Sequence, residues 1–216
     1  MIDRKRRIRI RQALLAWYSA AARDLPWRRT TDPYAIWLSE IMLQQTRVLT
    51  VIPYYERFLK RFPIVNHLAR ARLDTVLKMW EGLGYYSRAR NLHKAAREIV
   101  SRFRSRLPRT KDALITLPGV GRYTAGAIAS IAFDERVPLV DGNVERVLCR
   151  VFCIRGNPKD TMTQERIWRL AEELLPPNEV GRFNQALMEL GAEICIPRQP
   201  HCDECPLAKV CEARFH

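Results

Sequence analysis

Several common features are missing from this sequence of 216 residues, and each absence excludes a class of protein. No apolar run approaches the ~18 residues that a membrane-spanning helix needs. The basic start lacks the apolar block and small-residue cleavage site of a secretory signal peptide. Apolar and polar residues alternate nowhere for long, as a half-buried strand would require, and we find no internal repeat or low-complexity linker. Apolar residues make up 47 % of the chain, which excludes disorder.

Lysine is scarce, because thirty of the 37 cationic residues are arginine, and the net charge is +14. The planar fork of arginine binds phosphates and base edges with two parallel hydrogen bonds. This composition favours a nucleic acid as partner over a membrane surface or an acidic protein. The densest basic run, residues 4–11, leads into Leu14, Leu15 and Trp17, which indicates a helix docked on a core. An Arg-rich transit peptide is the alternative interpretation of that run.

Apolar residues recur at spacings of three and four, which predicts helices nearly throughout. Asp32, followed by Pro33, is predicted to begin one helix, and residues 82–84 form a loop before a long helix over about 85–104. Pro53 and Pro63 are expected to separate helices.

A tight turn stands out at residues 117–121, Leu-Pro-Gly-Val-Gly, before a helix of small residues. Gly119 and Gly121 accept positive φ and let another backbone approach. The N–H groups that follow such a turn, together with the helix dipole, bind phosphate well. This motif resembles the helix-hairpin-helix element of DNA repair proteins, and the resemblance implies that Gly119, Val120, Gly121 and Arg122 contact a DNA backbone, although a plain helix–turn–helix connection is the simpler alternative.

Two acidic residues have unusual surroundings. Asp141 lies about 20 residues beyond the turn and, taken alone, is an N-cap. It begins a helix whose apolar face is Val144, Val147, Leu148, Val151 and Phe152. Glu40 lies in an apolar segment, Trp-Leu-Ser-Glu-Ile-Met-Leu, although a glutamate at a solvated helix edge is the simpler interpretation.

Five blocks in this order resemble the adenine-specific, MutY-type DNA glycosylases of the helix-hairpin-helix superfamily. They are residues 37–46, 82–92, 117–126, 141–144 and 183–192. The resemblance covers about residues 25–211. It implies excision, by base flipping, of adenine mispaired with guanine or 8-oxoguanine in double-stranded DNA.

The resemblance also implies roles for individual residues. Glu40 is the general acid at the adenine ring, and Asp141 stabilises or captures the cationic sugar. Asn143 orients the reacting groups, and Tyr85 wedges into the duplex. The remaining residues expected to contact the mispair or the DNA backbone are Gln44, Gln45, Thr46, Arg47 and Arg88.

Tyr123 occupies the position where related endonuclease III-type enzymes carry a lysine. A phenol cannot form an imine, so the resemblance implies little or no strand cleavage. A thymine or uracil glycosylase acting at G·T or G·U mispairs is the alternative on the same fold. A non-catalytic iron–sulfur protein that binds DNA is the alternative of another class.

Four of the six cysteines lie in the last 22 residues, with the spacing C-x6-C-x2-C-x5-C. Clustered thiols without a secretion signal indicate a metal site in a reducing compartment, and the thiols alone suit zinc as well as iron–sulfur. The resemblance implies a [4Fe-4S] cluster held by Cys195, Cys202, Cys205 and Cys211.

The resemblance completes the expected architecture. We expect an all-α, two-lobe fold, with a six-helix domain over residues 30–137 and a cluster domain from residues 1–29 and 138–216. The sequence ends five residues after Cys211, so we expect a form without the domain that recognises 8-oxoguanine, which is either a naturally short member of the family or a catalytic fragment. We also expect the protein to be a monomer in the cytoplasm, associated with the nucleoid through DNA binding.

Overall fold

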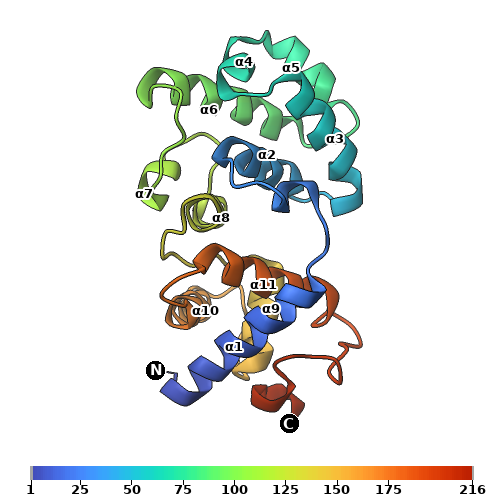
Figure 1. The fold of residues 1–216 in the computed structure, drawn as a ribbon, viewed down its shortest axis with the longest axis vertical. Helices are drawn as coiled ribbons and strands as arrows, with labels where there is room; N and C mark the ends of the chain where they lie inside the picture. Colours follow the sequence, from blue (N-terminus) through green and yellow to red (C-terminus); the bar gives the residue numbers. More distant parts are fainter. Residues whose placement is uncertain (1, 216) are drawn as a thin grey trace. The chain divides into compact units, whose positions relative to one another are not determined.

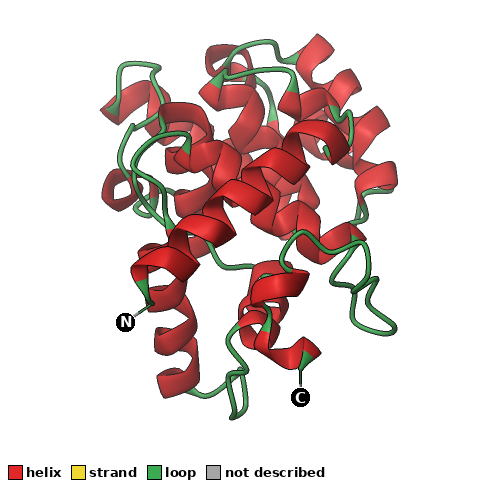
Figure 2. Ribbon diagram, turned by 60° about the horizontal axis from the view of Figure 1, so that its bottom comes forward, coloured by secondary structure: helices red, strands yellow, loops and turns green. Residues whose placement is uncertain are grey.

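The structure is a computed structural model that describes residues 2–215. Within this range the chain is helical and forms no strand (Figure 2), which confirms the all-α prediction. No helix in the described range is long and apolar enough to cross a membrane. The α-helices are α1 (Arg4–Ala21), α2 (Pro33–Leu43), α3 (Val48–Arg61), α4 (Val65–Arg70), α5 (Leu73–Trp80), α6 (Tyr86–Arg102), α7 (Lys111–Leu114), α8 (Arg122–Phe133), α9 (Gly142–Val151), α10 (Thr161–Leu174) and α11 (Val180–Glu193). Short 3₁₀ turns are η1 (Pro26–Arg28), η2 (Ala208–Val210) and η3 (Glu212–Arg214).

The chain divides into two compact units (Figure 1). The central unit is Asp24–Phe133 and holds α2 to α8, while the terminal unit joins Met1–Arg23 to Asp134–His216. The boundaries predicted from the sequence lie at residues 29/30 and 137/138, a few residues further along the chain than those of the structure. The prediction gave six helices to this central domain. The segment before residue 30 falls in the central unit because Trp27 packs edge-on against Tyr55 of α3, with ring centroids 5.5 Å apart.

Helix α2 forms the core of the central unit. Asp32 caps its N-terminus by accepting a hydrogen bond from the Tyr34 N–H, and Pro33 occupies the first turn, as predicted. Every residue from Tyr34 to Met42 is buried. A helix that is apolar on nearly all sides must be enclosed by its neighbours, and α2 packs against α3, α6 and α8. This burial encloses Ser39 and Glu40 as well.

The predicted tight turn lies between α7 and α8. Leu117 and Val120 point inward and are buried, while Gly119 adopts φ 77°, in the left-handed region that glycine tolerates. A Cβ at Gly119 would lie 2.8 Å from the Cβ of Asn91 on α6. The small residues that open α8, among them Ala125, are fully buried, and α8 packs closely on α2.

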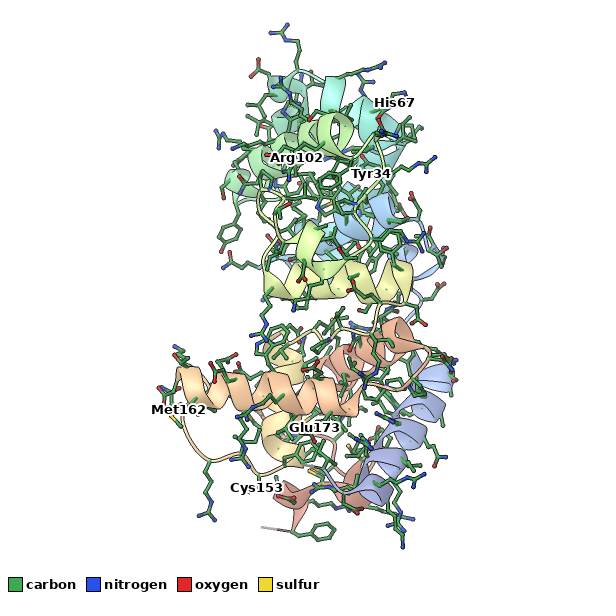
Figure 3. The ribbon with its side chains drawn as sticks, turned by 90° about the vertical axis from the view of Figure 1, so that its left-hand side faces the viewer. Tyr34, His67, Arg102, Cys153, Met162 and Glu173 are labelled. Carbon is green, nitrogen blue, oxygen red and sulfur yellow. The ribbon has the colours of Figure 1, made fainter. Side chains whose placement is uncertain are left out.

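In the terminal unit, α9 packs on α11, and α11 packs on α1 (Figure 1). Asp141 caps α9, whose buried face is Val144, Val147, Leu148 and Val151, as predicted. Helix α1 buries Ile10, Leu14 and Tyr18, which confirms that the basic run continues into a docked helix. Glu173 lies near the far end of α10 from the exposed Met162 (Figure 3), and its Oε2 accepts a hydrogen bond from the N–H of Ile2 at 2.8 Å.

The expectation for Pro53 is wrong, whereas Pro63 does follow the end of α3. Pro53 lies inside α3. A proline here removes the hydrogen bond to the carbonyl of Leu49. Leu49 is 82 % exposed, so water can bind that carbonyl, and the helix continues.

Substituting Gly119 by alanine should destabilise the protein, because the added Cβ meets Asn91 and the backbone favours glycine. We expect a loss of about 1–3 kcal/mol in the free energy of unfolding, measured by urea denaturation. Gly121→Ala is the matched control, because no atom lies within 4 Å of its added Cβ. Equal stability of the two variants would show that the turn does not need glycine at position 119.

Candidate active site

The central unit places Glu40 against Tyr123. Glu40 is only 6 % exposed, so the interpretation of this residue as a solvated helix edge is wrong. The Tyr123 hydroxyl donates a hydrogen bond to Glu40 Oε2 at 2.9 Å. The contact exists because α8 brings small, buried residues against α2, which lets the first turn of α8 reach the carboxyl group. The sequence indicated both residues but not their pairing.

Residues 44–47, which we call the reading loop, connect α2 to α3. Gln44 is half-buried and donates through Nε2 to Thr124 Oγ1 at 3.2 Å. Gln45 and Arg47 are exposed, and Thr46 is half-buried. Gln45 adopts φ 56°, a conformation that costs a non-glycine residue ~1–3 kcal/mol and persists where the surroundings enforce it. The exposed Gln45 and Arg47 side chains are available to a ligand at this surface.

Residues 82–85, which we call the wedge loop, lie in the connection between α5 and α6. Gly82, Gly84 and Tyr85 all have positive φ, of 90°, 75° and 49°. The Tyr85 side chain is 57 % exposed, and Tyr86 is exposed too, so these residues are not the core aromatic pair that would be the simpler interpretation. The Tyr85 ring is thus an exposed aromatic group on a turn with strained backbone.

Arg88, predicted to contact DNA, is buried and only 6 % exposed. Its guanidinium donates to main-chain carbonyls and to Thr46 Oγ1, and burial lowers the pKa of this group. Its surroundings therefore favour an internal role for the residue. Sequence reasoning missed this burial because an arginine in a basic protein is ordinarily a surface residue.

The hairpin presents three of its four expected contact residues. Gly119, Gly121 and Arg122 are exposed. Val120 is buried, and its N–H donates to the Leu117 carbonyl at 3.1 Å. The structure therefore gives Val120 a packing role within the turn.

In the terminal unit, Asp141 is held by two donors. Its Oδ1 accepts from the Val144 N–H at 2.8 Å, and its Oδ2 accepts from Asn143 Nδ2 at 2.9 Å. Asn143 Oδ1 in turn accepts from Arg146 Nη2 at 2.9 Å. A Cβ at Gly191 of α11 would lie 2.6 Å from the Asn143 Cβ, so only glycine fits there. This bonding fixes the orientation of the Asp141 carboxylate.

Arg146 is a residue that sequence reasoning missed. It also donates through Nε to the carbonyl of Cys195 at 2.7 Å and through Nη2 to that of Gly191. The available signal was the spacing, because Asn143 and Arg146 are three apart and share one face of α9.

The four clustered cysteines line one cavity of about 170 Å³ in the terminal unit. Burial, and then the nearby thiols of Cys195, Cys211 and Cys202, raise the pKa of the Cys205 thiol. Arg150 Nη1 lies 3.4 Å from Cys195 Sγ. In residues 2–215 no group of three or more His, Cys, Asp or Glu side chains is placed to hold a metal ion. Thiols around a cavity suit a group larger than one ion.

The glycine turn between α7 and α8, with the start of α8 bonded to a buried carboxyl group, defines a helix-hairpin-helix protein. Residues 38–173 match the HhH-GPD superfamily of base excision DNA repair proteins. The chain belongs to this superfamily, which confirms the resemblance found in the sequence.

Individual relatives agree with this membership. The chain is 50 % identical over 213 residues to the adenine DNA glycosylase of Homo sapiens. This alignment covers 94 % of this chain and 39 % of the relative. It is 44 % identical over 205 residues to an adenine DNA glycosylase of Buchnera aphidicola, covering 94 % of this chain and 59 % of that protein. The chain thus spans between about two fifths and three fifths of the length of these relatives.

Solved structures share the fold. A thermostable thymine-DNA glycosylase superposes with a TM-score of 0.88 at 32 % identity, over 98 % of this chain and 97 % of that one. Endonuclease III in a non-covalent DNA complex gives a TM-score of 0.81 at 22 % identity, over 100 % of this chain and 98 % of that one. The second likeness shows the fold alone.

Proposed function

We propose that this chain is a monofunctional DNA glycosylase that excises adenine from mispairs with guanine or 8-oxoguanine. The buried Glu40 carboxyl group carries the proposal, because a carboxyl group that is enclosed within the central unit and bonded to the half-buried Tyr123 hydroxyl is equipped to deliver a proton in a water-poor site. The choice of adenine rests on identity. The adenine-specific relative of Homo sapiens is 50 % identical, whereas the thymine-specific structure is 32 % identical.

The proposed reaction uses two carboxyl groups. Protonated Glu40 donates its proton to a ring nitrogen of the flipped adenine, and the C1′–N9 bond breaks with its electron pair moving to the base. The Asp141 carboxylate, oriented by Val144 and Asn143, stabilises the cationic sugar. Water then adds its oxygen to C1′, and its proton passes to the Glu40 carboxylate, which regenerates the acid.

The proposed DNA contacts follow from exposure. Gly119, Gly121 and Arg122 of the hairpin meet a phosphate, and the exposed Gln45 and Arg47 meet the mispair and its flanks. Gln44 and Thr46, both half-buried, complete the reading loop. Tyr85 replaces part of the stacking lost on extrusion. Because phosphate contacts release counterions, binding should weaken steeply with salt.

We further propose that Cys195, Cys202, Cys205 and Cys211 hold a [4Fe-4S] cluster. The cavity that these four thiols line supports this choice. When bound, the cluster would tie the loop after α11 into one rigid element. The protein would act as a monomer in the reducing cytoplasm, at the nucleoid.

A panel of duplexes containing 8-oxoG·A, G·A, G·T and G·U tests the activity, with alkali treatment after incubation to reveal abasic sites. We expect excision of adenine only. Asp141→Asn and Glu40→Gln should each lower single-turnover excision by about 10²-fold or more while leaving duplex affinity nearly unchanged. Glu56→Gln is the control, because Glu56 is an exposed carboxyl group on α3.

Each other outcome of the panel has a defined meaning. Excision of thymine or uracil would favour the alternative mismatch glycosylase. No excision from any duplex by the wild-type protein would favour a non-catalytic DNA-binding protein. Full turnover by Glu40→Gln would show that the acid is another residue.

Borohydride trapping tests the absence of a lyase step. By the resemblance, Tyr123 occupies the position of the lysine that forms a Schiff base in endonuclease III-type enzymes, and its phenol cannot supply the amine. We expect almost no covalent protein–DNA adduct after reduction, whereas Tyr123→Lys should give a measurable yield. A high yield from the wild-type protein would contradict monofunctional hydrolysis.

Metal analysis tests the cluster. We expect about four iron atoms and four acid-labile sulfides for each chain, and Cys202→Ser should lower both. Cys149→Ser is the matched control, because Cys149 lies on α9 and does not line the cavity. Colourless protein loaded with zinc would refute the cluster.

A further inference from the structure

The guanidinium of Arg88 lies between the reading loop and the wedge loop. Nη1 donates towards the last turn of α2 and the reading loop, and Nη2 donates to both loops. The acceptors of Nη1 are the carbonyls of Ile41 (3.1 Å), Met42 (2.7 Å) and Gln44, and those of Nη2 are Thr46 Oγ1 (3.0 Å) and the carbonyls of Leu83 and Gly84 (both 3.2 Å). One side chain therefore binds two segments that are about forty positions apart in the sequence.

Both segments need such support, because each carries a non-glycine residue in the left-handed region. Gln45 has φ 56° and Tyr85 has φ 49°. Residues in this conformation are retained where neighbouring bonds over-determine the backbone, and they concentrate at binding and catalytic sites. Arg88 bonds to the carbonyl immediately before Gln45 and to the carbonyl immediately before Tyr85.

The chemistry of these contacts requires arginine. The planar fork offers donors in several fixed directions, which the single ammonium of lysine does not. The Arg88 Cζ also lies 5.3 Å from the centre of the Tyr85 ring and 5.4 Å from that of Trp80, within the range of a cation–π contact. The guanidinium thus contacts the wedge residue directly as well as its backbone.

We propose that Arg88 is a positioning residue that couples the reading loop to the Tyr85 wedge, so that contact with the mispair and extrusion of the base occur as one step. The residue acts from inside the protein, through its neighbours, and does not itself touch DNA. The proposal rests on the proposed glycosylase function for its effect on extrusion, while the coupling of the two loops is a property of the protein alone.

Hydrogen exchange and fluorescence test the two parts separately. In the DNA-free protein, amide exchange of residues 44–47 and 82–86 is compared among wild type, Arg88→Lys and Arg88→Met. Base extrusion is followed with a duplex that carries 2-aminopurine in place of the mispaired adenine, because 2-aminopurine fluoresces when it leaves the stack. Arg97→Lys and Arg97→Met are matched controls, since Arg97 is an exposed arginine on the same helix, α6.

We expect both loops to exchange at least tenfold faster in Arg88→Lys, with exchange in α8 unchanged. The extrusion rate should fall at least tenfold, with the affinity for a fully paired duplex within twofold of wild type. If Arg88→Met does not fold, Arg88→Lys still decides the question. Exchange that is unchanged in both loops, or faster in only one, would overturn the coupling.

The wild-type protein separates this proposal from the function on which it rests. If it neither extrudes 2-aminopurine nor excises adenine, the glycosylase function fails, and the exchange data still decide whether Arg88 joins the loops. If wild type extrudes the base and Arg88→Lys does so equally fast, the function stands and the positioning role of Arg88 is refuted.

Discussion

The close packing of α8 on α2 is the contact on which the central unit depends. Helix α2 is apolar on nearly all sides, so it is stable only when enclosed. Helix α8 contains the small buried residues Ala125, Gly126 and Ala127, and small side chains let the two helices approach closely. This approach has a chemical consequence, because it buries the Glu40 carboxyl group and brings the Tyr123 hydroxyl to it. The packing and the candidate chemistry thus have one origin.

Arginines have two different tasks in this protein, and net charge alone does not separate them. Arg11 of α1 donates to carbonyls at the end of α10, and Arg6 donates to the carbonyl of Val151 at the end of α9. Arg88 does the same at the end of α2. The last carbonyls of a helix have no partner inside the helix. A cation placed there also interacts favourably with the negative end of the helix dipole. A share of the positive charge therefore stabilises the fold, and the exposed remainder is available to a polyanion.

The terminal unit shows how a polar site is held in place by bonds that extend beyond it. Asp141 is held by Asn143, Asn143 by Arg146, and Arg146 by the carbonyl of Cys195. These successive hydrogen bonds hold the carboxylate in one orientation. The first cysteine of the candidate cluster loop is thereby connected to the candidate catalytic residue.

The sequence alone determined the features that arise within a few neighbouring residues. These are the helical periodicity, the caps Asp32 and Asp141, the glycine turn and the spacing of the four cysteines. The tertiary structure alone decided that Glu40 is buried, that Tyr123 binds it, that Arg88 faces inward, and that Pro53 can stay inside α3. The physical reason is distance along the chain. Glu40 and Tyr123 are 83 positions apart, and no local pattern encodes which distant side chain will enclose a carboxyl group until the helices have packed.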